Sequence, residues 1–233
     1  MMFETWTVVI LIWANVLGGA MALPQAIKTL RTGRTEGVST VWIGLSVGVN
    51  LWWVAYGLGV DDIGIVPVGA ISVTAYSLIG LGVARALPSS ARSRPVAQMV
   101  ASAVAVGSVP AFALWVGGWP VAGVILGLLY GVQLSPAVVT AYRSADVSGM
   151  SASTWIIALV EAVLWGVYGL VRADSGLLAL AATGIVMSVL VLARLTARRP
   201  RGRRRGHSRR LSPTGRRGVR LRPSFVGTVP IPA

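Results

Sequence analysis

Seven long apolar runs alternate with short polar segments along most of the chain. They cover residues 6–23, 41–60, 63–87, 96–116, 119–142, 154–171 and 177–196. A helix needs about 20 consecutive apolar residues to cross the hydrocarbon core of a bilayer, and each run is close to that length. The pattern therefore predicts an all-α membrane protein with seven transmembrane helices.

Composition supports this interpretation and narrows the chemistry. Hydrophobic residues make up 55% of the chain and charged residues 12%, whereas soluble domains carry about 25% charged residues. The chain has no cysteine, its single histidine is His207, and its seven acidic residues form no ligand cluster in the sequence. We therefore expect no metal ion, no cofactor and no enzyme active site, because no nucleophile, base and orienting residue share one membrane depth.

Two segments of the chain are related in sequence, with matching residues 112 positions apart. The first reads LPQAIKTLRTGRTEGVSTVW from Leu23 to Trp42, and the second reads SPAVVTAYRSADVSGMSASTW from Ser135 to Trp155. One register that holds across two helices and a loop indicates an internal repeat. It pairs Pro24 with Pro136, Arg31 with Arg143, Gly37 with Gly149, Ser39 with Ser151, Trp53 with Trp165, Tyr56 with Tyr168, Gly57 with Gly169 and Asp62 with Asp174.

The basic residues define an orientation in the membrane, since lysine and arginine accumulate in cytoplasmic loops. With the N-terminus outside, all of the 21 basic residues except Arg172 lie inside, and the C-terminus is cytoplasmic. Arginine greatly outnumbers lysine, and alanine, glycine and valine are abundant, as in proteins of GC-rich bacterial genomes. We therefore expect a multi-pass protein of the bacterial cell (inner) membrane.

The matching loops also constrain how the repeats are arranged. A unit of three helices ends on the opposite side of the membrane from where it began, so two such units in direct succession would be inverted. Both matching loops are basic and belong inside, so the copies must be parallel and one additional crossing is required. We expect a first three-helix repeat at 5–87, a linker transmembrane helix at 96–116 and a second repeat at 119–196, a 3+1+3 plan.

The remaining residues, 197–233, form an arginine-rich segment that supplies most of the net charge of +14. Its low apolar content predicts a disordered cytoplasmic tail. We expect this tail to fix the topology and to contact membrane lipids with anionic headgroups. Nucleic acid is not an expected partner, because the tail lacks aromatic residues interleaved for base stacking.

Several short motifs occur in both copies. The first copy has Pro24-Gln25, Gly37-Val38-Ser39 and Trp53-x-x-Tyr56-Gly57, and the second has Ser135-Pro136-Ala137, Gly149-Met150-Ser151 and Trp165-x-x-Tyr168-Gly169. This doubled pattern resembles the PQ-loop superfamily, which includes the SWEET and MtN3 sugar transporters. The resemblance implies alternating-access movement of a small solute, with the substrate site between the two three-helix units.

The resemblance has two further implications. The prolines of the PQ motif are assigned a hinge role in the family, so we expect Pro24, Gln25 and Pro136 to form a pair of hinges. Proline removes a backbone hydrogen bond and makes a helix easier to bend, although plain helix termination near a loop is the alternative. Smaller bacterial members build the same structure by dimerising one unit, so a homo-oligomer is compatible with the resemblance.

Polar side chains inside the apolar runs are candidates for the substrate site, because such groups usually face a bundle interior or an aqueous cavity. Glu161 is the one carboxylate within a run, on the same helical face as Trp165. It is a candidate for proton coupling, for accepting a hydrogen bond from a solute, or for bonding a neighbouring helix. The substrate-binding candidates are Asn15, Ser46, Asn50, Trp53, Ser72, Tyr76, Glu161, Trp165 and Thr183.

One departure from the sugar-transporting relatives concerns asparagine. Those relatives carry an asparagine after a proline in the third helix of each unit, but here Val68 follows Pro67, and residues 180–184 also lack asparagine. We expect a carrier of a small polar, sugar-like solute, and a proton-coupled carrier of an amino acid or another small metabolite is the alternative. A non-transporting membrane receptor or scaffold, which would rely on the basic tail, is the second alternative.

Overall fold

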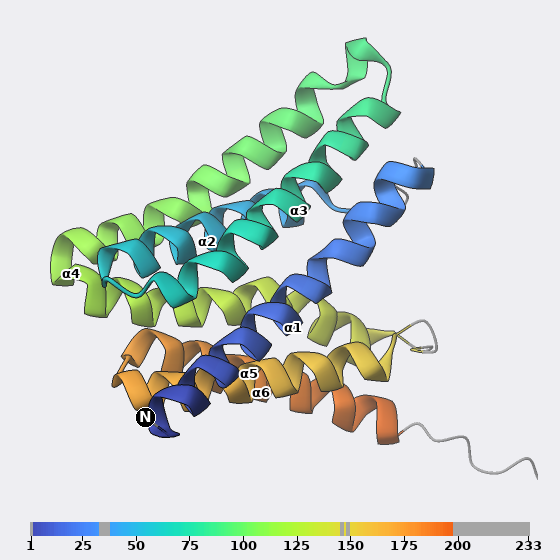
Figure 1. The fold of residues 1–233 in the computed structure, drawn as a ribbon. Helices are drawn as coiled ribbons and strands as arrows, with labels where there is room; N and C mark the ends of the chain where they lie inside the picture. Colours follow the sequence, from blue (N-terminus) through green and yellow to red (C-terminus); the bar gives the residue numbers. More distant parts are fainter. Residues whose placement is uncertain (1, 33–37, 145–146, 148–149, 198–233) are drawn as a thin grey trace, which may run out of the picture. The chain divides into compact units, whose positions relative to one another are not determined.

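The computed structural model describes residues 2–32, 38–144, 147 and 150–197, without the side chains of residues 2–4, 22, 24, 25 and 28. The expected tail lies outside these residues apart from its first position. The described residues form helices joined by short connections, which confirms the all-α prediction (Figure 1). The elements are α1 (Met2–Thr32), α2 (Thr40–Gly59), η1 (Ile63–Ile65), α3 (Val66–Ala86), η2 (Ser89–Ala91), α4 (Ser93–Arg143), α5 (Ala152–Arg172) and α6 (Ser175–Ala197).

The helices have the length and surface of membrane spans. Within the described part of the chain, the segments 40–59, 63–86, 89–143, 152–172 and 175–197 are long and apolar enough to cross a membrane, and α1 contains a shorter apolar stretch at 5–21. Large apolar side chains cover the outside of the bundle, including Trp115, which is 80% exposed, and Leu170, which is 69% exposed. Because so much exposed apolar surface is stable in hydrocarbon but not in water, we describe the chain as a multi-pass helical membrane protein.

α4 contains two of the predicted spans, and Gly118 divides them. Its φ of 68° and ψ of −167° lie outside the helical region, in a conformation that is essentially restricted to glycine. Figure 1 shows the two halves of α4 running in opposite directions. The runs at 96–116 and 119–142 are therefore separated by a single-residue break in place of a loop.

Close helix crossings hold the bundle together. α3 packs against both α1 and α2, α6 packs against both α4 and α5, and α1 also contacts α5. The first half of α4 lies along α2, where a Cβ on Gly48 would come within 2.7 Å of the Ala103 carbonyl oxygen. The second half lies along α6, where a Cβ on Gly127 would come within 2.7 Å of the Gly176 carbonyl oxygen. Glycine at these crossings lets the backbones approach each other closely.

The turn after α2 and the turn after α5 have the same backbone conformation. Asp61 and Ala173, which are 112 positions apart, have φ values of 54° and 53°. In each turn the next residue donates its amide to a glycine carbonyl, at 2.8 Å in the first copy and 2.9 Å in the second. The sequence repeat is therefore matched by a repeat in local structure.

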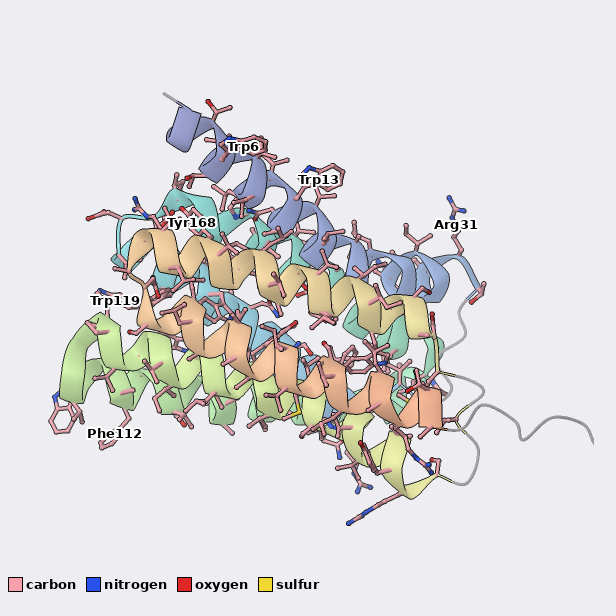
Figure 2. The ribbon with its side chains drawn as sticks, turned by 90° about the horizontal axis from the view of Figure 1, so that it is seen from below. Trp6, Trp13, Arg31, Phe112, Trp119 and Tyr168 are labelled. Atoms are coloured by element: carbon pink, nitrogen blue, oxygen red, sulfur yellow. The ribbon has the colours of Figure 1, made fainter. Side chains whose placement is uncertain are left out.

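The helices that lead into these turns also begin alike. The Ser39 hydroxyl caps α2 by accepting a hydrogen bond from the Trp42 amide, and the Ser151 hydroxyl caps α5 by accepting one from the Thr154 amide. Figure 2 shows Arg31 at one end of the bundle and Tyr168 with Trp119 at the opposite end. We refer to these as the Arg31 end and the Tyr168 end.

Candidate functional site

A central cavity of about 60 Å³ lies among all six helices. Its lining combines amides, hydroxyls, aromatic rings and one carboxyl group with apolar walls, a mixture that suits a small polar solute. The lining residues are Gly18, Met21, Asn50, Trp53, Ile65, Val68, Ser72, Tyr76, Tyr130, Gln133, Glu161, Trp165, Leu177 and Leu180.

Gln133 connects α4 to α2 beside this cavity. Its Nε2 atom donates a hydrogen bond of 3.0 Å to the Ser46 hydroxyl, and both side chains are buried. Asn50 Nδ2 donates to the Ser46 carbonyl oxygen at 2.8 Å, and Tyr76 lies next to Ser46 and Gln133. Polar groups from α2, α3 and α4 therefore form one cluster at the cavity.

Glu161 occupies the opposite wall, where only 7% of its surface is exposed. Its Oε1 atom accepts a hydrogen bond of 3.3 Å from Trp165 Nε1. Gly18 of α1 provides the space for this carboxyl group, because a Cβ there would come within 2.5 Å of Glu161 Oε1. In the first copy Val49 takes the place of Glu161, and Trp53 Nε1 is buried with no hydrogen-bond partner in the described part of the chain.

A larger cavity of about 820 Å³ lies toward the Arg31 end of the bundle. Both copies line it through the first turns of α2 and α5, with Trp42 on one side and Trp155 on the other. Met21 and Gln133 line both cavities. The two cavities are therefore neighbours that share part of their walls, and the larger one lies at the ends of the two matching loops.

Two tyrosine–aspartate pairs close the Tyr168 end. The Tyr56 hydroxyl donates to Asp174, with 2.9 Å to each carboxylate oxygen. The Tyr168 hydroxyl donates to Asp62 with the same two distances. Arg172 Nε adds an ion pair of 3.0 Å to Asp62 Oδ2. Each pair joins a residue of one copy to a residue of the other.

The two aspartates are held in place by the helices that follow them. Asp62 Oδ1 accepts a hydrogen bond of 3.1 Å from the Gly64 amide, and Asp174 Oδ1 accepts one of 2.9 Å from the Leu177 amide. Each carboxylate thus satisfies an amide of the next helical segment while it binds a tyrosine of the other copy. The closure is therefore built from fixed acceptors on both sides.

The structure brings most of the sequence-predicted substrate residues together. Asn50, Trp53, Ser72, Tyr76, Glu161 and Trp165 line the central cavity, and Ser46 reaches it through Gln133. Asn15 and Thr183 are not among the lining residues. Asn15 bonds the Gly64 carbonyl and the Val68 amide, and Thr183 bonds the Gly127 carbonyl, so both join helices to each other.

Of the expected hinge residues, Pro136 lies inside α4 and lines the larger cavity. Pro24 and Gln25 belong to α1, but their side chains lie outside the described part of the structure. Tyr130 was not selected from the sequence, although its position three residues before Gln133 puts both on one helical face. No group of three residues able to hold a metal ion occurs among the described side chains.

Comparisons with known proteins give a likeness in fold. No protein-family model and no curated protein sequence matches the chain. The solved structure of a eukaryotic SWEET transporter is similar, with a TM-score of 0.64 at 15% sequence identity, and the match covers 82% of this chain and 98% of that chain. The chain therefore has a SWEET-like fold.

Proposed function

We propose that the protein is a membrane carrier that moves a small polar solute by alternating access. The observation that carries the proposal is the asymmetry around the central cavity. Two tyrosine–aspartate pairs join the copies at the Tyr168 end, whereas a much larger cavity that shares Met21 and Gln133 with the central one lies toward the Arg31 end. Alternating access requires a central site that is closed on one side while it is open on the other. The SWEET-like fold supports a transporter in preference to an enzyme.

A 3+1+3 arrangement accounts for the packing. In this proposal α1, α2 and α3 form the first unit, the first half of α4 is the linker, and the second half of α4 with α5 and α6 forms the second unit. The third helix of each unit contacts the other two, α3 in the first and α6 in the second. The equivalent turns, the equivalent serine caps and the cavity shared by the starts of α2 and α5 support two units that face the same way.

The proposed transport step exchanges contacts at the Tyr168 end for contacts at the Arg31 end. For the Tyr168 end to open, both tyrosine–aspartate bonds between the units must break. A hydrogen bond to a charged group contributes about 1.5–3 kcal/mol, so the open state needs compensating contacts elsewhere. Closure of the wide cavity would provide them by burying apolar side chains that line it and are exposed in this state, such as Val41.

We further propose that the Arg31 end faces the cytoplasm of a bacterial cell. The last turns of α1, α3, α4 and α6 carry Arg31, Arg85, Arg143 and Arg194. Arg172, in the last turn of α5, lies beside Asp62 at the Tyr168 end. Basic residues gathered at one end support that end as the cytoplasmic one. We also propose that the basic tail contacts anionic lipid headgroups and that the protein forms a homo-oligomer.

A second candidate function is a proton-coupled carrier, and the burial of Glu161 favours it. A carboxyl group that exchanges between two access states can carry a proton with the solute. Uptake into proteoliposomes of a panel of sugars, amino acids and amines, with and without a pH gradient, tests both candidates. A carrier should retain flux after residues 198–233 are removed, whereas a scaffold that uses the tail should lose its function.

Site-directed labelling tests the access states themselves. The chain has no cysteine, so Ser72→Cys would place a single thiol in the central cavity without background. A membrane-impermeant thiol reagent should reach it from the Arg31 end much faster than from the Tyr168 end. Equal rates from both ends, in a protein that moves none of the panel, would contradict the proposed function.

A further inference from the structure

The central cavity contains a carboxyl group that has no basic partner among the described side chains. Glu161 is more than nine-tenths buried, and no lysine or arginine is among the residues that line the cavity. The carboxyl group accepts a hydrogen bond of 3.3 Å from the neutral Trp165 indole. A charge in this position is costly unless something pairs with it, and intramembrane carboxyl groups usually mark the path of an ion or a substrate.

The fold itself does not need this carboxyl group. The equivalent position in the first copy holds Val49, which is also buried. The turn that follows each helix and the tyrosine–aspartate pair are alike in both copies. The difference between Val49 and Glu161 therefore points to what the cavity binds.

A second polar group in the cavity is also without a partner. Trp53 is 5% exposed, lines the cavity, and its Nε1 atom has no hydrogen-bond acceptor in the described part of the chain. Its counterpart Trp165 donates to Glu161, but the position equivalent to Glu161 in the first copy is Val49, whose side chain has no acceptor. A buried donor without an acceptor costs free energy, and an oxygen atom of a bound solute would satisfy it.

Aromatic rings surround these two groups. Trp53, Trp165, Tyr76 and Tyr130 all line the cavity together with Glu161. Aromatic rings together with a carboxylate are the surroundings in which proteins bind ammonium groups, because the ring faces are negative. An uncharged sugar would leave the carboxyl group unpaired.

We infer that the solute is a small organic ammonium compound that also carries an oxygen atom. Its cationic nitrogen pairs with Glu161 among the four aromatic rings, and its oxygen accepts a hydrogen bond from Trp53 Nε1. The cavity of about 60 Å³ is small, so the solute must be small, and the site widens where needed to hold it. This inference names the substrate class of the proposed carrier and therefore rests on the proposed function.

Direct binding tests the inference separately from transport. The full-length protein in lipid nanodiscs is titrated by calorimetry with choline, with its uncharged isostere 3,3-dimethyl-1-butanol, and with glucose. Because a hydrogen bond or contact to a charged group is worth at least tenfold in affinity, choline should bind at least about tenfold more tightly than the isostere. Glucose should not compete with choline.

Three variants identify the residues. Glu161→Gln keeps the shape of the side chain and should weaken choline binding at least about tenfold. Trp53→Phe should weaken the binding of choline more than the binding of tetramethylammonium, which has no oxygen atom. Ser188→Ala is the matched control. The Ser188 hydroxyl is also buried with no hydrogen-bond partner among the described residues, but it does not line the cavity, so this variant should bind choline as tightly as the parent protein does.

The outcomes separate the inference from the proposed function. Choline binding without choline flux supports the inference and contradicts the carrier. Sugar flux that Glu161→Gln leaves unchanged supports the carrier and overturns the inference. The inference is also overturned if the folded parent protein binds no ammonium compound, or if Glu161→Gln binds choline normally and loses only uptake driven by a pH gradient. Size-exclusion profiles and thermal unfolding verify that each variant is folded.

Discussion

The hydroxyl of Tyr56 lies 2.9 Å from both carboxylate oxygens of Asp174 and donates to them across the boundary between the two copies. The equivalent residues, Tyr168 and Asp62, make the reciprocal contact at the same distances. Because each tyrosine and its aspartate belong to different copies, neither bond survives if the copies separate at this end. In the proposed carrier, opening of the Tyr168 end would therefore require both bonds to break.

Removing both hydroxyls should favour opening at the Tyr168 end. The double variant Tyr56→Phe/Tyr168→Phe keeps the rings and deletes two hydrogen bonds to charged groups, each worth about 1.5–3 kcal/mol. In a Ser72→Cys background, labelling from the Tyr168 side should accelerate at least about tenfold, and each single variant should have a smaller effect.

Tyr142→Phe is the control for this experiment. Its hydroxyl donates to the Leu190 carbonyl at 3.1 Å, which joins α4 to α6 away from the two tyrosine–aspartate pairs. Labelling from the Tyr168 side should not change in this variant. If the double variant also labels at the parental rate, the tyrosine–aspartate pairs do not control access.

Arg172 makes the closure asymmetric. It bonds Asp62 at 3.0 Å, whereas its counterpart in the first copy is Val60, so the Asp174 side has no equivalent arginine. The Arg172 side chain is 48% exposed, and exposed ion pairs contribute up to about 1 kcal/mol. We predict that Arg172→Gln accelerates labelling from the Tyr168 side no more than about fivefold.

The dependence of the labelling rate on salt concentration distinguishes an ion-pair role of Arg172 from a packing role. At low ionic strength the difference between Arg172→Gln and the parent should be largest, and at about 1 M salt it should nearly vanish, because exposed charges are then screened. This difference is measured as the rate of thiol labelling at both ionic strengths, with and without Arg172→Gln in the Ser72→Cys background. A difference that is the same at both would mean that the aliphatic part of Arg172 is what matters.

The sequence predicted which positions are equivalent but not which residues are partners. The offset of 112 residues pairs Tyr56 with Tyr168 and Asp62 with Asp174, and the local structures agree. The structure joins the tyrosine of one copy to the aspartate of the other. That exchange depends on how the two copies are packed, and the periodicity within one copy contains no information about it.

The candidate site shows the same limit at the level of single side chains. Asn50 and Asn15 are both amides inside apolar runs, and inward orientation was the reason to select them. Asn50 lines the cavity, while Asn15 bonds the backbone around the start of α3. An asparagine inside an apolar run can form its hydrogen bonds in either place, so the sequence alone does not tell which one lines the cavity. The pairing of the lone carboxyl at Glu161 with Trp165 could be predicted, because a spacing of four residues defines one helical face.

The backbone conformation at position 118 should make glycine necessary for full stability. Its φ of 68° is unfavourable for other residues, yet a Cβ there would have open space, with Pro120 Cδ at 3.7 Å as its nearest neighbour. Gly118→Ala should therefore lower the free energy of unfolding by about 1–3 kcal/mol through backbone strain alone. Thermal unfolding in detergent, followed by tryptophan fluorescence, measures the loss.

The neighbouring exposed residue Val116 provides the comparison for Gly118. Val116→Ala trims a side chain on the outside of α4 without a change in backbone conformation, and it should unfold close to the parent. If Gly118→Ala unfolds at the parental temperature as well, the break between the halves of α4 tolerates an ordinary residue.

Pro136 should make α4 easier to bend beside the larger cavity. Proline has no amide hydrogen, so the carbonyl of Val132, four residues earlier, lacks its helical partner. The Ser135 hydroxyl donates to that carbonyl at 2.8 Å in its place. Pro136→Ala would restore the backbone hydrogen bond and stiffen the helix at this point, so we predict slower turnover with unchanged expression and equal or higher thermal stability.

The initial rate of solute uptake into proteoliposomes measures this effect, with Pro110→Ala as the matched control. Pro110 also lies inside α4, but in the half that precedes Gly118 and packs on α2. Because that half is the linker in the proposed arrangement, its stiffness should not limit the exchange between access states. Slower uptake in Pro136→Ala alone supports a local hinge at this proline. Equal slowing in both variants would indicate a general effect of proline in α4. Uptake at the parental rate in Pro136→Ala would rule out the hinge, because bending at Pro136 would then not be needed for transport.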